Sequence, residues 1–250
     1  MSDLKVSLIT TTIYVPTVLK LYRDIDEHVT FYVMGDKKTP HDETRRFVES
    51  LGNSHYYSDK DQENLGYESS PIIGWNKIMR RNIALLEALK NGADIIVTID
   101  DDNIPMNENY FNDYLSIFTK HFRGMAIESD LDWFNAGDFM TPNVYHRGFP
   151  YELRNKPIEY SMTPASGSKI GVALGMWCGD PDISAMERIT NKPTVLEFSQ
   201  LLQEGIILKN NQFGPFNSQN TAYIRELAPL MMVLVGVGRY DDIWASYIAE

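Results

Sequence analysis

The sequence of 250 residues contains one cysteine, Cys178, and no long uninterrupted apolar run. A single thiol excludes a disulfide within the chain and fits a reducing compartment. The most apolar late segment, residues 227–237, is interrupted by Pro229 and Gly236. It is also shorter than the roughly 20 apolar residues that span a bilayer. Residues 1–16 lack the basic start and long apolar stretch of a signal peptide. These absences predict a cytoplasmic protein that does not insert into a membrane.

Basic residues are outnumbered by acidic ones, 23 against 34, which gives a formal net charge of −11. A surface this acidic repels phosphate backbones and anionic lipids, so we expect no nucleic-acid partner. A small anionic substrate remains compatible with this charge, because a bound divalent cation reverses the local field. Hydrophobic residues make up 43% of the chain, which is enough for a large buried core.

Strand and helix patterns alternate along the first hundred residues. We expect strands at residues 5–13, 28–34, 55–57 and 93–99, and helices at residues 16–24, 40–51 and 75–90. This alternation predicts an α/β fold with a mainly parallel central sheet flanked by helices. After Pro105, a helix at residues 110–121 and many Gly, Pro and aromatic residues predict a mixed α+β second half. We expect one domain over residues 1–250, with a nucleotide-binding half at 1–105 and a second half at 106–250.

Polar residues follow three of the expected strands at the point where each strand ends. In open α/β sheets, ligands bind outside the carboxyl ends of the strands. We therefore expect a single ligand-binding rim. Its residues are Thr10, Thr11, Thr12, Asp36, Asp100, Asp101 and Asp102.

The three adjacent aspartates at residues 100–102 are the sharpest feature of this rim. They repel one another, and a hard cation such as Mg²⁺ or Mn²⁺ that bridges to phosphate oxygens would neutralise them. Alternate residues at a strand end point to opposite sides, so Asp100 and Asp102 can face one way while Asp101 faces the other. An acidic turn or a helix N-cap would explain the same residues. Their position directly after a buried strand favours the metal site.

The segment VTIDDDNIP resembles the metal-binding aspartate motif, of DXD type, of GT-A glycosyltransferases. It is most similar to that of the reversibly glycosylated polypeptides, or UDP-arabinopyranose mutases. Further blocks resemble this family in the same order. They are HRGFPYELR at 146–154, GMW followed by DPD at 175–182, NTAYIRE at 220–226 and GRYDDIW at 238–244. Ordered agreement of several blocks is more specific than any one motif.

This resemblance implies a GT-A-like, Rossmann-like fold and a set of roles. Asp100 and Asp102 would hold a divalent cation on the diphosphate, and Asp101 would contact the nucleotide. Arg147 matches the arginine that becomes reversibly glycosylated, and Arg154 matches a second arginine near the sugar. The acidic pair on the sugar or acceptor side is matched by Asp241 and Asp242.

The chemistry of arginine favours only part of these roles. A guanidinium stays protonated and is a weak nucleophile, but it is an excellent bidentate clamp for diphosphate. We therefore expect Arg147 to bind an anion rather than to form a covalent bond. Without the resemblance, a solvated or salt-bridged loop would explain both Arg147 and Arg154.

The contacts expected around the nucleotide rest on fewer observations. Thr10, Thr11 and Thr12 could contact the ribose or the base, and Asp36 could accept a hydrogen bond from the uracil N3–H. Gly-Asp is equally common in ordinary turns. Arg81 could reach the diphosphate from the helix before residues 100–102, which we call the acidic turn. Helical arginines are, however, usually solvated.

The sequence also departs from the family. The family continues beyond the position of Glu250, so we expect either a shortened relative or a chain that lacks its C-terminal part. A third protein ligand for the metal would then be missing. Glu152 stands where the family has a serine, which changes the polarity near the sugar.

These observations favour an enzyme that uses a UDP-sugar with Mn²⁺ or Mg²⁺. A mutase that interconverts the pyranose and furanose forms of a UDP-pentose is the first hypothesis. A glycosyltransferase that passes the sugar to a separate acceptor would use the same donor-side residues. A third hypothesis is an inactive subunit that binds nucleotide or a partner, which an exposed apolar surface at 227–237 would favour. The sequence leaves open whether the chain forms homo- or hetero-oligomers.

Overall fold

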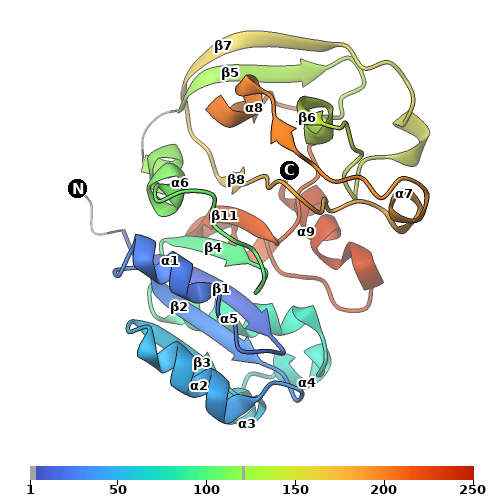
Figure 1. Cartoon of the computed structure of the whole chain (residues 1–250). Helices are drawn as coiled ribbons and strands as arrows, with labels where there is room; N and C mark the ends of the chain where they lie inside the picture. The colour runs from blue at the N-terminus through green and yellow to red at the C-terminus, as the bar shows by residue number, and fades with distance from the viewer. Residues whose placement is uncertain (1–3, 120–121) are drawn as a thin grey trace.

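The computed structural model describes residues 4–119 and 122–250, and a six-stranded sheet lies at its centre (Figure 1). The strand order is β3(Ser54–Tyr57), β2(Thr30–Gly35), β1(Val6–Thr12), β4(Ile95–Ile99), β11(Asn220–Ile224) and β8(Val172–Leu174). The first four strands are parallel, whereas β11 runs antiparallel to both β4 and β8. The expected α/β fold is therefore confirmed in its coarse form, but the sheet is mixed rather than purely parallel.

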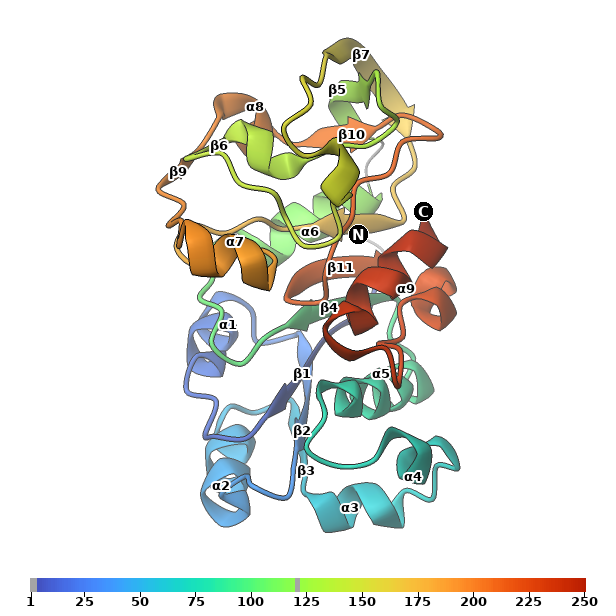
Figure 2. The ribbon, with the colours of Figure 1, turned by 90° about the vertical axis from the view of Figure 1, so that its right-hand side faces the viewer.

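Apolar side chains on both faces explain why β1 and β4 form the middle of this sheet. Every residue of β4, with the sequence IIVTI, is buried. Alternate residues of a strand point to opposite faces, so Leu8 packs into one core cluster and Ile9 into another. Helices α1(Leu19–Ile25) and α2(His41–Ser50) cover one face, and α5(Arg81–Lys90) covers the other (Figure 2).

The helix expected at residues 75–90 begins later than the sequence pattern indicates. Asn76 has a positive φ of 56°, and a 3₁₀ turn, η1(Ile78–Arg80), comes before α5. The helix is also not amphipathic, because most of its length is buried. Two short helices that the pattern did not indicate, α3(Asp59–Asn64) and α4(Ser69–Ile73), lie on the same side of the sheet as α5 (Figure 2).

The second half builds a smaller sheet at the opposite end of the molecule from α2 and α3 (Figures 1 and 2). Strand β5(Phe122–Ser129) pairs antiparallel with β7(Tyr160–Ser168) and parallel with β10(Ile206–Leu208). A two-stranded pair joins β6(Met140–Thr141) to β9(Glu197–Phe198). The remaining helical segments are α6(Tyr110–Thr119), η2(Ala136–Phe139), η3(Tyr151–Leu153), α7(Ala185–Thr190), α8(Gln200–Glu204), η4(Arg225–Leu230), η5(Gly238–Tyr240) and α9(Asp241–Ala249). The last two residues of the helix expected at 110–121 lie outside the described residues.

The apolar segment at residues 227–237 forms no strand. It consists of the end of η4 and irregular turns. Ala228 and Val233 are buried in the core, whereas Val235 and Val237 are more than two fifths exposed. None of the helices in the described residues combines the length and the apolar character needed to cross a lipid bilayer.

Candidate functional site

A cavity of about 360 Å³ opens where β1, β2 and β4 end, and we call it the rim pocket. Most of the residues expected at this rim line it: Thr11, Thr12, Asp36, Arg81, Asp100, Asp101 and Asp102. Thr10 is an exception, because it is fully buried and does not line the pocket. Its hydroxyl donates to the Ile99 carbonyl at 2.9 Å, so Thr10 joins β1 to β4 instead of facing a ligand.

The three aspartates after β4 have different surroundings. Asp100 accepts hydrogen bonds from Arg81 and, at 2.9 Å, from the Gln219 amide. Asp101 accepts a hydrogen bond from the Thr12 hydroxyl, and burial raises the pKa of Asp101 despite that bond. Asp102 is exposed, and among the described residues it has no hydrogen-bond or ion-pair partner. Among the described residues, Asp102 therefore has both carboxylate oxygens free and Asp101 has one.

This donor set decides what kind of metal site the rim pocket can form. Within residues 4–119 and 122–250, no group of three or more His, Cys, Asp and Glu is arranged to hold a metal ion. Mg²⁺ is commonly bound through one or two carboxylates, with substrate phosphates and water as its other ligands. The residues present thus fit a cation shared between Asp102 and a bound phosphate. They do not fit one held by the protein alone.

Asp36 lines the rim pocket, but its carboxylate is already engaged by the backbone. It accepts hydrogen bonds from the N–H groups of Lys37 at 2.6 Å, Asn76 at 2.9 Å and Lys77 at 3.3 Å. These bonds tie the end of β2 to the segment before η1. The turn interpretation therefore describes the present contacts of Asp36, and the expected bond to a uracil N3–H stays a prediction.

Arg81 is buried, with 2% of its surface exposed, so it is not the solvated helical arginine of the alternative interpretation. One guanidinium nitrogen, Nη2, pairs with Asp100. The other, Nη1, donates to both the carbonyl and the hydroxyl of Ser218, each at 2.7 Å. Arg81 therefore joins the acidic turn to the segment that leads into β11.

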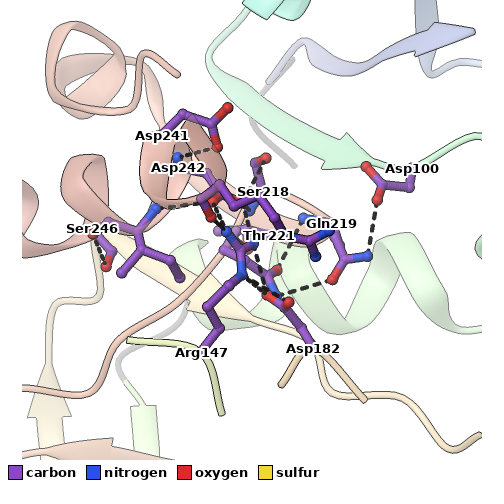
Figure 3. A network of polar contacts seen from close by, with 12 residues as sticks. Asp100, Arg147, Asp182, Ser218, Gln219, Thr221, Asp241, Asp242 and Ser246 are labelled. Carbon is purple, nitrogen blue, oxygen red and sulfur yellow. Dashed lines mark hydrogen bonds and ion pairs between the residues drawn. The ribbon is translucent and has the colours of Figure 1, made fainter. Parts of the chain in front are cut away.

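The second set of expected residues gathers around the guanidinium of Arg147 (Figure 3). Its Nε and Nη2 donate to Asp182 at 2.8 and 2.9 Å, and its Nη1 pairs with Asp242 at 3.1 Å. Nη1 also donates to the carbonyl of Arg239. We call Arg147, Asp182 and Asp242 the Arg147 cluster. All three nitrogens of Arg147 have partners, so none is free to clamp a diphosphate in this conformation.

Charge pairing in the Arg147 cluster shifts the pKa values of Arg147 and Asp242. Burial alone would lower the pKa of Arg147, but its bonds to Asp182 and the charge of Asp242 outweigh burial and raise that pKa. Burial would raise the pKa of Asp242, and Arg147 instead holds it below its usual value. Asp241, beside it in α9, has its pKa raised by burial and by the charge of Asp242. These ion pairs favour the protonated form of Arg147, and the expectation that it forms no covalent bond stays a prediction.

Arg154 belongs to a neighbouring set of contacts. Its guanidinium pairs with Glu187 at 3.2 Å, donates to the Ser184 hydroxyl at 3.3 Å and lies 4.0 Å from the ring centre of Tyr151. No hydrogen bond or ion pair between described residues joins it to the Arg147 cluster. In this conformation both Arg147 and Arg154 are held in salt bridges, as the alternative interpretation expected.

The polar run at residues 217–219 is part of the site, and the sequence pattern did not reveal it. Asn217 donates to Asp182 at 2.8 Å, the Ser218 N–H donates to Asp242 at 3.1 Å, and Gln219 donates to Asp100. The one feature of the sequence that could have indicated this part of the site is that three polar residues come directly before the strand β11. Because β11 is antiparallel to β4, the start of β11 lies at the edge where β4 ends. The sequence alone did not indicate that direction.

Comparison with known proteins supports the resemblance seen in the motifs. No family model matches the sequence. A probable UDP-arabinopyranose mutase 4 of Arabidopsis thaliana is 26% identical over 163 residues, which cover 62% of this chain and 41% of the relative. UDP-arabinopyranose mutase 1 of Oryza sativa subsp. japonica is 26% identical over 160 residues, with 61% and 40% covered. UDP-arabinopyranose mutase 3 of Arabidopsis thaliana is 28% identical over 171 residues, with 62% and 41% covered.

The matched region extends over more than half of this chain and less than half of each relative. The chain spans about two fifths of the length of the curated relatives it matches. By sequence, the chain is similar to the UDP-arabinopyranose mutases, the family that its ordered motifs indicated.

Proposed function

We propose that this chain binds a UDP-sugar in the rim pocket and interconverts the pyranose and furanose forms of its sugar. The relatives are named UDP-arabinopyranose mutases, which supports a UDP-sugar mutase activity. In the finer form of the proposal, the fold is GT-A-like, with the acidic turn after a central strand as its nucleotide-binding motif. At about 360 Å³, the rim pocket is within the size range of small-molecule sites.

One observation carries this proposal. The predicted nucleotide side and the predicted sugar side are joined by an unbroken series of hydrogen bonds and ion pairs. The series begins at Asp100, continues through Arg81 to Ser218, and reaches the Arg147 cluster at Asp242. A substrate with a diphosphate at the acidic turn would therefore have its sugar close to the Arg147 cluster.

The residues around the substrate would then have different roles. Lys38, Lys77 and Arg80 line the rim pocket and supply positive charge for the phosphates. Asp102 and the diphosphate would share Mn²⁺ or Mg²⁺, which stabilises negative charge on the departing UDP. Arg147 would orient its neighbours as a protonated cation. Asp241, whose pKa is raised by burial and by the charge of Asp242, would exchange a proton with a sugar hydroxyl.

The test is incubation of the purified protein with UDP-arabinopyranose and Mn²⁺ without any acceptor, followed by separation of the ring forms. We expect UDP-arabinofuranose to accumulate. Asp102→Asn should abolish the product and the metal dependence of UDP binding, whereas Asp42→Asn, at an exposed site on α2, should change neither. If the wild-type protein binds UDP and forms no ring-isomerised product, the proposal of a mutase activity is wrong.

A glycosyltransferase is the second proposal, and the larger cavity of the molecule favours it. This cavity, of about 990 Å³, lies between β8 and β10, and Arg147 and Asp182 form part of its wall. It would accommodate an acceptor beside the sugar. Release of UDP that depends on an added acceptor, with no ring isomer formed in its absence, would select this activity over the mutase.

A further inference from the structure

Arg81 lies at the rim pocket and balances the negative charge of Asp100. Its guanidinium is buried and pairs with Asp100, the first of the three aspartates. The second oxygen of Asp100 is held by Gln219 at 2.9 Å. Both oxygens of Asp100 are therefore occupied by donors from the protein itself. A divalent cation that used Asp100 would have to displace its charged partner, Arg81, or the Gln219 amide.

We infer that Arg81 is a positioning residue that neutralises Asp100 from within the protein, so that a divalent cation binds tightly only together with the nucleotide diphosphate. The inference rests on the proposed function, since it concerns the same rim pocket. It assigns the cation to Asp102 and removes Asp100 from the predicted metal ligands.

The argument follows from charge and ligand number. Without nucleotide, a cation at residues 100–102 would find Asp102 and one oxygen of Asp101, and a fixed positive charge at Arg81. These few protein oxygens and water make a weak site for Mg²⁺ or Mn²⁺, and the nearby positive charge weakens it further. A diphosphate supplies both the missing oxygen ligands and the missing negative charge. Binding of the cation and binding of the nucleotide should then strengthen each other.

A second observation indicates that the pocket is built for an anion. Arg80 also lines the rim pocket and is fully buried. It contacts Gln62, Ser70 and the ring of Trp75, and its Nη2 has no hydrogen-bond partner among the described residues. In contrast with Arg81, no carboxylate in the described part of the chain forms an ion pair with Arg80. Arg80 is thus a buried cation without an ion pair at the wall, beside Lys38 and Lys77, whereas Arg81 balances Asp100.

The first experiment measures Mn²⁺ binding without nucleotide, by electron paramagnetic resonance of free Mn²⁺. Arg81→Gln frees Asp100, so the variant should bind Mn²⁺ alone about tenfold more tightly than the wild type. Arg81→Lys keeps the charge and should stay close to the wild type. Arg45→Gln, which breaks the Arg45–Asp61 pair away from the pocket, is the matched control and should have no effect. The double variant Arg81→Gln, Asp100→Asn should lose the gain.

The second measurement needs no variant and therefore does not depend on the folding of Arg81→Gln. In the wild-type protein, UDP should tighten Mn²⁺ binding at least about tenfold. Equal Mn²⁺ affinity with and without bound UDP would overturn the inference, as would an Arg81→Gln protein that folds and gains no affinity for Mn²⁺. The second result leaves the proposed function standing. The first result would also overturn the cation shared by Asp102 and the diphosphate, because UDP binding would then be independent of metal, but it would not contradict UDP-sugar binding in the rim pocket. A wild-type protein that binds no UDP at any metal concentration contradicts the proposed function itself.

Discussion

At the scale of single residues, the fold gives different surroundings to ionisable residues of the same type. The three aspartates at 100–102 are identical in type, yet one is paired with Arg81, one is bonded to Thr12, and one is exposed. The sequence predicted their common location because a buried strand leads to them. It could not assign their roles, because their partners Arg81, Gln219 and Thr12 come from three distant parts of the chain.

Arg147 gives the strongest stability prediction at this scale. Replacing it with methionine leaves Asp182 and Asp242 buried without their cation. Breaking a buried pair by removing one partner costs about 3–5 kcal/mol, so urea denaturation should show a loss of that size. Arg188→Met removes a similar pair with Asp180 at an exposed site and should cost about 0–1 kcal/mol. Similar losses for the two variants would mean that the Arg147 cluster is not buried in solution.

His146 provides a prediction for pH dependence. Burial lowers its pKa from 6.5 to about 4, against the opposing charge of Asp182. As the pH falls below 6.5, the unfolded chain takes up a proton at this position and the folded chain does not. The free energy of unfolding should therefore decrease between about pH 6.5 and pH 4.

Urea denaturation at pH 7.5 and pH 5.0 measures this decrease. His146→Gln should reduce the difference between the two pH values, whereas His28→Gln, at an exposed position, should leave it unchanged. An equal difference in the wild type and in His146→Gln would show that His146 is not the group responsible.

At the scale of elements, the strands with continuous apolar sequences were predicted well. Residues 5–13 and 93–99 correspond to β1 and β4, because burial on both faces leaves few other structures for such runs. The start of α5 was predicted wrongly, because the pattern of apolar residues continues through Asn76 while the backbone there has a positive φ. That backbone shape depends on bonds from Asp36, forty residues earlier. Local sequence cannot encode such a contact.

The segment before η1 offers a test of this explanation. Asp36→Ala removes three hydrogen bonds to backbone N–H groups at a buried position. The three donors belong to exposed residues, so water can replace part of this bonding, and we expect a loss of about 1–3 kcal/mol in urea denaturation. Asp24→Ala, which removes an exposed pair with Lys20, should change stability by less than about 1 kcal/mol. Hydrogen exchange should become faster at Asn76 and Lys77 in the first variant only.

At the scale of the whole molecule, the central sheet takes strands from both parts of the sequence. The first four strands lie within residues 6–99, and β8 and β11 come from the second half. Arg81 with Ser218, and Gln219 with Asp100, add polar contacts across the same boundary. A ligand in the rim pocket should therefore stabilise the two halves together rather than the first half alone.

Scanning calorimetry can test this coupling. A ligand present at a hundred times its dissociation constant stabilises a protein by about 2.7 kcal/mol. For a chain of this size, that corresponds to an increase of about 5–10 °C in Tm. With UDP and Mn²⁺ at such concentrations, we expect a single unfolding transition that moves upward as a whole. Two transitions, of which only one responds to UDP, would mean that the halves unfold independently. In that case the contacts between Ser218 and Asp242 would not transmit binding energy from the acidic turn to the Arg147 cluster.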